Sequence, residues 1–316
     1  MKTKITTKKL NLELQKSYHR STNKTNKSIS FPGNIKVYDI GRDTLLVEID
    51  ESQVIKNMQE NENSIDGWGL VLNRWLNKKI VLHWSVPKNI ANLHYQRFLF
   101  RIKCFIKFFS PNISLSEEAI LNLNDLRLSD NEIFHTNEST GTKRNLITKS
   151  ILTTEHDYEL FFYNNNNIFQ TILNTTTSTH KFFRQFPIGL FKHKKATKNA
   201  VFTHKKSAID LISCDTESLN IYELKKPKNK SIGIISELFF YTIFMMNIVD
   251  GKFVLPKGSS FNFSDIKRIS SFMLVEQNDL HPLIDIELIN IIKSKELNFG
   301  VIFYEIEGDN CVLTTM

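Results

Sequence analysis

The second half of the chain alternates short β-rich runs with longer apolar segments of helical length, which limits the folds it can adopt. A weak helix is predicted first, over residues 157–175. The later elements are predicted as three strands, a helix, a strand, a helix and a strand, over residues 200–203, 208–213, 219–224, 232–249, 269–275, 283–293 and 300–306. This order predicts an α/β layer arrangement around a mixed sheet.

The first half gives a less regular pattern. Short strands are predicted at 35–38 and 44–49, whereas residues 95–109 fit neither the helical nor the strand period cleanly, so helix and strand both stay open there. Residues 129–148 are polar, lose periodicity and predict a linker. We therefore expect an α+β protein with a basic, flexible arm (1–30), an N-terminal α+β domain of unknown role (31–148) and a C-terminal domain (149–316).

Positive charge is concentrated at the N-terminus. The formal net charge of the chain is +8, and residues 1–30 carry eight lysines and arginines against one acid, Glu13. Such an arm is typical of polyanion contacts, because each cation at a phosphate releases a condensed counterion. A solvated tail in a Lys- and Asn-rich chain explains the same charges equally well.

The cysteine content and the hydropathy of the chain limit the cellular compartment that we expect for it. The chain has three cysteines, far apart in sequence, which predict neither a disulfide framework nor a metal site and suit a reducing cytoplasm. The longest apolar run, residues 238–246, is much shorter than the ~20 residues that span a bilayer. We therefore expect a cytoplasmic protein without a membrane partner.

Three polar residues interrupt predicted strands of the second half. Asp210 lies in the strand at 208–213, and Glu223 and Lys225 flank Leu224 at the end of the strand at 219–224. Residues i and i+2 of a strand share a face, so Glu223 and Lys225 project together. Two carboxylates at close range repel unless a hard divalent cation lies between them, and such a cation can polarise a phosphate and activate water.

A strand Asp followed by a Glu-X-Lys strand resembles the PD-(D/E)XK nuclease superfamily, over residues 155–306. The resemblance implies a restriction-endonuclease-like domain that hydrolyses phosphodiester bonds, in DNA rather than RNA, with Mg²⁺ or Mn²⁺ and in DNA defence or repair. Asp210, Glu223 and the Leu224 carbonyl would hold the metal, and Lys225 would position water or stabilise charge at phosphorus. Glu237 and Tyr241, four apart on the next helix, resemble the family's Gln-X-X-X-Tyr motif with Glu in place of Gln. Glu237 is then a third metal ligand or a DNA contact.

Further residues are candidates for supporting roles. Glu159 is the candidate for the acid that the family's first helix often contributes, and Arg184 for a phosphate contact. A basic loop beside the site offers three nucleic-acid contacts that are equally well explained as solvated charges: Lys226, Lys228 and Lys230. The alternatives to a nuclease are a nucleic-acid-binding module that does not cut and a regulatory protein in which Glu223 and Lys225 form a structural ion pair. The sequence leaves the oligomeric state open, a homodimer included.

Overall fold

The chain forms two compact units. Unit 1 comprises residues 1–128, 231–237 and 281–292, and unit 2 comprises residues 129–230, 238–280 and 293–316. The computed structural model describes all residues except 1, 27, 59, 61, 62, 130–132, 137–151, 174–180, 203–206, 260, 261, 295 and 309. The expected domain boundary at 148/149 and most of the expected linker therefore lie outside the described residues.

Unit 1 is built on a five-stranded sheet in the order β1-β2-β3-β4-β5. β1, β2 and β3 are antiparallel neighbours, and β3, β4 and β5 run parallel. Its elements are β1 (Thr3–Ile5), α1 (Thr7–Thr22), β2 (Lys36–Gly41), β3 (Thr44–Ile49), α2 (Glu51–Val54), α3 (Ile65–Leu76), β4 (Lys79–Trp84), α4 (Leu93–Phe109), β5 (Ile113–Leu115), α5 (Glu117–Asn122) and α9 (Ile286–Ile292).

The N-terminus corrects the expectation of a flexible arm over residues 1–30. Residues 3–22 form β1, which pairs with β2, and α1, a 16-residue helix. The helix is held because Leu10 and Leu14, spaced i and i+4, are buried at 1% and 0% exposure. Thr6 caps its first turn by accepting a hydrogen bond from the Lys9 N–H.

Residues 95–109, left open between helix and strand, belong to helix α4. The period is obscured because two arginines of this helix are buried among its apolar residues. Arg101 pairs with Asp66 at 2.9 Å between Nε and Oδ2 and donates to the Asn63 carbonyl. The Asp66 carboxylate also accepts from the Ser236 hydroxyl at 2.7 Å, so every partner in this network belongs to unit 1.

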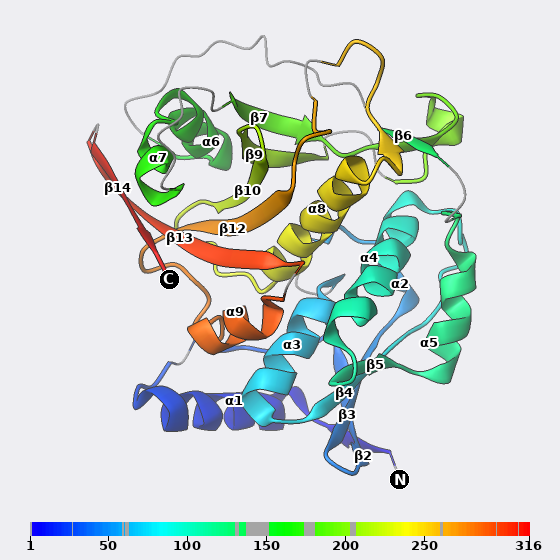
Figure 1. The fold of residues 1–316 in the computed structure, drawn as a ribbon. Coiled ribbons are helices and arrows are strands. Elements are labelled where there is room, and N and C mark those ends of the chain that lie inside the picture. The colour runs from blue at the N-terminus through cyan, green and yellow to red at the C-terminus, as the bar shows by residue number, and fades with distance from the viewer. Residues whose placement is uncertain are drawn as a thin grey trace. The chain divides into compact units, whose positions relative to one another are not determined.

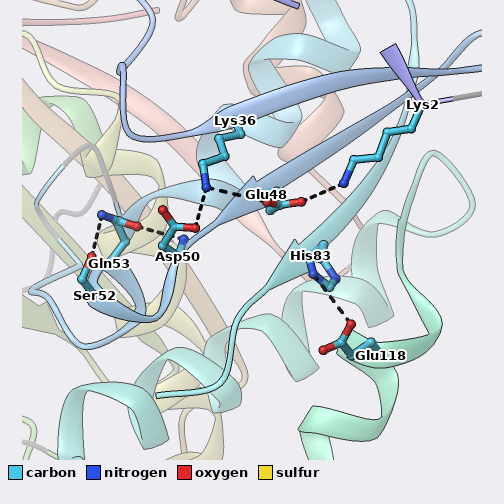
Figure 2. Close-up of polar contacts among 8 residues, drawn as sticks. All are labelled: Lys2, Lys36, Glu48, Asp50, Ser52, Gln53, His83 and Glu118. Atoms are coloured by element: carbon cyan, nitrogen blue, oxygen red, sulfur yellow. Dashed lines mark hydrogen bonds and ion pairs between the residues drawn. The ribbon is translucent and has the colours of Figure 1, made fainter. Parts of the chain in front are cut away.

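One face of the unit 1 sheet carries a network of paired charges, shown in Figure 2. Lys36 pairs with Asp50 at 2.7 Å and with Glu48 at 3.9 Å, while Lys2 pairs with Glu48 at 3.0 Å. His83 lies across from Glu48 on the adjacent parallel strand. Cations on this face are therefore balanced by neighbouring carboxylates.

Unit 2 contains a six-stranded mixed sheet in the order β14-β13-β12-β10-β9-β7 (Figure 1). β7, β9 and β10 form an antiparallel set, whereas β10, β12 and β13 are parallel. A small second sheet has the order β11-β6-β8. The elements of unit 2 are α6 (Glu155–Asn164), α7 (Ile168–Leu173), β6 (Phe134–Thr136), β7 (Lys181–Pro187), β8 (Leu190–Lys192), β9 (Ala208–Cys214), β10 (Ser218–Lys225), β11 (Phe253–Val254), β12 (Arg268–Glu276), β13 (Asn298–Glu307) and β14 (Asn310–Thr315).

The two faces of the large sheet are covered by different helices. Tyr222 and Leu224 of β10 pack with Phe162 and Phe169 of α6 and α7 in one buried cluster. On the other face, the Ser271 and Thr242 hydroxyls hydrogen-bond at 2.6 Å, which holds α8 (Gly233–Val249) against β12. Because strand residues alternate between faces, Glu223 and Lys225 lie on the α8 side of β10.

The predicted α+β class is confirmed, since both units combine mixed sheets with helices. One of the strands predicted in the second half is wrong: the first strand of the antiparallel set is β7, not residues 200–203. Ala200 forms only an isolated bridge to Phe191. The sequence of β7 does not alternate between buried and exposed residues as a regular strand does, because Gln185, at φ +56°, interrupts the strand. Among the described residues, no helix is both long and apolar enough to cross a bilayer.

Candidate functional site

The candidate site begins where β9 and β10 run side by side. The last pair of their register is Tyr222 opposite Leu211, so Asp210 and Glu223 come next along the two strands. The Leu224 N–H donates to the Asp210 Oδ2 at 3.0 Å, which fixes the Asp210 carboxylate against β10. The structure thus brings together the two carboxylates that the sequence singles out.

Glu223 and Lys225 form a buried ion pair. Glu223 is 0% exposed and Lys225 is 5% exposed, and the Lys225 ammonium donates to the Glu223 Oε1. Withdrawing two charges from water is strongly unfavourable unless they compensate each other. The two charges therefore stay paired, and the surrounding sheet holds them in place. The position of Lys225 at the end of β10 leaves its ammonium beside the first turn of α6.

Glu155, which the sequence analysis missed, is the second carboxylate at this lysine. Its Oε1 lies 3.5 Å from the Lys225 Nζ. Thr154 begins α6 through a reciprocal capping box with Asp157, and this start places Glu155 in the first helical turn. The Thr-X-X-Asp cap at 154–157 is the sequence signal that could have identified the start of α6.

Glu159, predicted as the first-helix acid, lies one turn further along and has different partners. It accepts from the Gln185 side chain at 2.8 Å and pairs with Arg184 at 3.3 Å. Burial raises the pKa of the Glu159 carboxyl, while Gln185 and Arg184 act in the opposite direction. The Arg184 side chain is itself buried and also hydrogen-bonds His156 at 3.0 Å. In this structure Arg184 therefore compensates Glu159, and its role as a phosphate contact stays a prediction.

Tyr304 of β13 holds the end of β10 in place through a hydrogen bond to its backbone. Its hydroxyl donates to the Lys225 carbonyl at 3.0 Å, and its ring packs against Phe162 with 5.2 Å between centroids. Burial raises the pKa of Tyr304 well above its ordinary value, so the hydroxyl stays a donor at neutral pH. The sequence gives no sign of this contact, because it joins strands 79 residues apart.

The three candidate contacts of the basic loop differ in their surroundings. Lys226 is exposed and directly follows Lys225. The Lys228 N–H and the Lys230 ammonium both interact with Asp279, the latter at 3.2 Å, and Lys230 also donates to the Asn278 carbonyl at 2.7 Å. Burial opposes ionisation of Asp279, but these hydrogen bonds outweigh it and lower its pKa. Lys230 thus has a structural role, and Lys226 and Lys228 are both exposed.

Glu237 and Tyr241 lie one turn apart on α8, with 1% and 3% exposure. The helix runs through both units: Glu237 belongs to unit 1 and Tyr241 to unit 2. Their proposed roles at the site stay predictions.

The donor set at β9 and β10 fits a hard divalent cation. Asp210 and Glu223 offer carboxylate oxygens, and the Leu224 carbonyl belongs to the same strand end. Mg²⁺ typically takes one or two protein carboxylates and keeps several waters, so two carboxylates suffice. Over the described part of the chain, no group of three or more His, Cys, Asp or Glu side chains is arranged to hold a metal ion.

No protein-family model, curated protein or solved structure matches this chain.

Proposed function

We propose that unit 2 is a metal-dependent nuclease that hydrolyses phosphodiester bonds, preferentially in DNA, at the adjoining ends of β9 and β10. The observation that carries the proposal is the convergence of Asp210, Glu223 and Lys225 on neighbouring strands, with Asp210 bonded to the backbone between the other two. The element order around it supports the same proposal: α6, three antiparallel strands, α8 and the parallel strand β12.

Each residue has a distinct role in this proposal. Asp210, Glu223 and the Leu224 carbonyl hold Mg²⁺ or Mn²⁺, which supplies Lewis-acid polarisation of a phosphate oxygen when bound. The Lys225 ammonium orients the attacking water or stabilises negative charge developing at phosphorus. Glu155, whose Oε1 lies 3.5 Å from Nζ, would help to keep that ammonium charged and in place.

The direct test is cleavage of a panel of single- and double-stranded DNA and RNA in Mg²⁺, Mn²⁺ or EDTA. The proteins are wild type, Lys225→Ala and, as the control, Lys257→Ala, which removes an exposed lysine of unit 2 with no proposed role at the site. We expect wild type and Lys257→Ala to cut with metal only and Lys225→Ala to be inactive. Equal cutting by all three proteins would identify a contaminant or a different site.

Metal binding gives a second readout that does not require cleavage. A ligand present at ten times its Kd stabilises the folded state by about 1.4 kcal/mol. Mg²⁺ should therefore raise the melting temperature of wild type but not that of Asp210→Asn. Nucleic-acid binding without any response to Mg²⁺ would instead favour a binding module that does not cut.

A further inference from the structure

Helix α1 of unit 1 has a basic face that its own fold does not use. Lys8, Lys9, Lys16 and Arg20 are all exposed and lie on the half of the helix opposite the buried Leu10 and Leu14; we call these four cations the α1 basic face. Residues at these spacings fall on one side of a helix with 3.6 residues per turn. Glu13, the one carboxylate of the helix, lies at the edge of this face and is half-buried.

The four cations of the α1 basic face lack the carboxylate partners that several other cations of unit 1 have. Lys2 and Lys36 pair with Glu48 and Asp50 (Figure 2), as do Lys78 with Asp43 and Arg74 with Asp285. Within the described residues, none of the four cations of the α1 basic face forms an ion pair with a carboxylate. Their charge is therefore available to an external anion.

Helix stability does not explain Lys8 and Lys9 either. Lys8 and Lys9 stand in the first turn, which contains no acid. A cation there opposes the helix dipole and destabilises the helix. Residues that act against local stability are expected where a surface serves binding.

A neighbouring pocket of about 830 Å³ shares Lys9 and Arg20 but is not itself the anion site. Two of its other cations, Arg74 and Lys78, are ion-paired, a third, Lys4, is exposed, and Glu13 and Asp39 also line it. The pocket lining therefore mixes cations with carboxylates, whereas positive charge predominates on the exposed helix face.

We propose that the α1 basic face of unit 1 binds the phosphate backbone of nucleic acid. A membrane surface is the other common partner of a basic helix, but such helices insert an apolar face into the lipid. In α1 that face is occupied, because Leu10 and Leu14 are buried at 1% and 0% exposure. The inference shares only its ligand class with the proposed function and can be tested without cleavage.

The test measures oligonucleotide affinity from 0.05 to 0.5 M salt in EDTA, on a Lys225→Ala background that removes any contribution from cutting. The face variant is Lys8→Ala/Lys16→Ala/Arg20→Ala. The matched control removes three other exposed lysines of unit 1, as Lys79→Ala/Lys88→Ala/Lys107→Ala. Each phosphate contact contributes ~0.7 to the slope of log affinity against log salt for single strands and ~0.9 for duplex DNA. For the three cations removed, the slope should therefore fall by about 2 with single strands and by about 3 with duplex.

A loss of about 2 in the salt slope corresponds to roughly 100-fold weaker binding at 0.1 M salt, if the two proteins bind equally at 1 M. The control should retain the wild-type slope. Equal losses in both variants would mean diffuse attraction and overturn the proposal, as would no loss in either. Binding to vesicles rich in anionic lipid, without binding to oligonucleotides, would overturn it in favour of a membrane. Lys8→Glu should weaken nucleic-acid binding while raising the melting temperature, so lost affinity cannot be attributed to unfolding.

Discussion

The buried Glu223–Lys225 pair permits a stability prediction that does not depend on activity. Replacing Glu223 with Gln removes one charge of the pair and leaves the ammonium, 5% exposed, facing Glu155 at 3.5 Å. Removing one partner of a fully buried pair typically costs about 3–5 kcal/mol. Because Glu155 still compensates part of the charge, we expect a loss of about 2–3 kcal/mol in the free energy of unfolding of unit 2.

A double-mutant cycle separates this pair from its surroundings. Lys225→Met should also destabilise unit 2, whereas Glu223→Gln/Lys225→Met removes both charges together and should lose much less than the sum. The expected coupling energy is about 2 kcal/mol. Glu155→Gln is the control, since that side chain is 36% exposed and its pairing with Lys225 should contribute less than about 1 kcal/mol.

The positions of the tryptophans allow the unfolding of unit 1 to be followed separately. All three, Trp68, Trp75 and Trp84, belong to unit 1, so their fluorescence reports that unit, while far-UV circular dichroism reports both. Urea unfolding at pH 7 without divalent metal should shift the circular dichroism transition of the variants. Additive losses in the cycle, or a single variant as stable as wild type, would refute the assignment of a compensated buried pair.

Three further outcomes are expected. Burial raises the pKa of Tyr95 to about 12, so its neutral form stabilises unit 1 fully below pH 10, and this stability is lost as the pH rises from 10 to 12. The loss is about 3 kcal/mol, and Tyr95→Phe should flatten the pH dependence of the tryptophan unfolding transition. Gly300→Ala should destabilise unit 2 by about 1–3 kcal/mol in urea unfolding, because a Cβ there would lie 3.0 Å from the Phe272 ring. Lys8→Glu should stabilise α1 by about 0.5–1 kcal/mol in thermal melts, and a lower melting temperature would contradict the dipole argument.

Much of the unit 2 sheet can be predicted because its strands are short, buried and separated by clear turns. The predicted strand at 219–224 is β10 (Ser218–Lys225), and the predicted helix at 232–249 is α8 (Gly233–Val249). The same pattern places Glu223 and Lys225 on one face and Asp210 on the neighbouring strand. These are local properties of the chain, so periodicity is enough to find them.

The rest depends on tertiary contacts that no local pattern encodes. Glu155 and Glu159 are one turn apart, and which of them reaches Lys225 is decided by where α6 begins relative to the end of β10. The arm became a helix because Leu10 and Leu14 find a core to pack on, although the surrounding residues read as a polar tail. Buried Arg97 and Arg101 likewise obscured α4, since they hydrogen-bond Asn57 and Asn63, which lie outside this helix.

The composition of unit 1 from three separate segments has a consequence for biosynthesis. Residues 281–292 supply the Leu283 carbonyl that accepts from the Trp75 indole at 2.8 Å and the Asp285 carboxylate that pairs with Arg74. At typical translation rates, residue 292 is added on the order of 10–30 s after residue 128. During that interval the nascent N-terminal segment has no partner for these groups, so its completion must wait until residue 292 has been made. A truncated message ending before residue 281 should yield a product that recruits chaperones or is degraded, even though all of the first 128 residues are present.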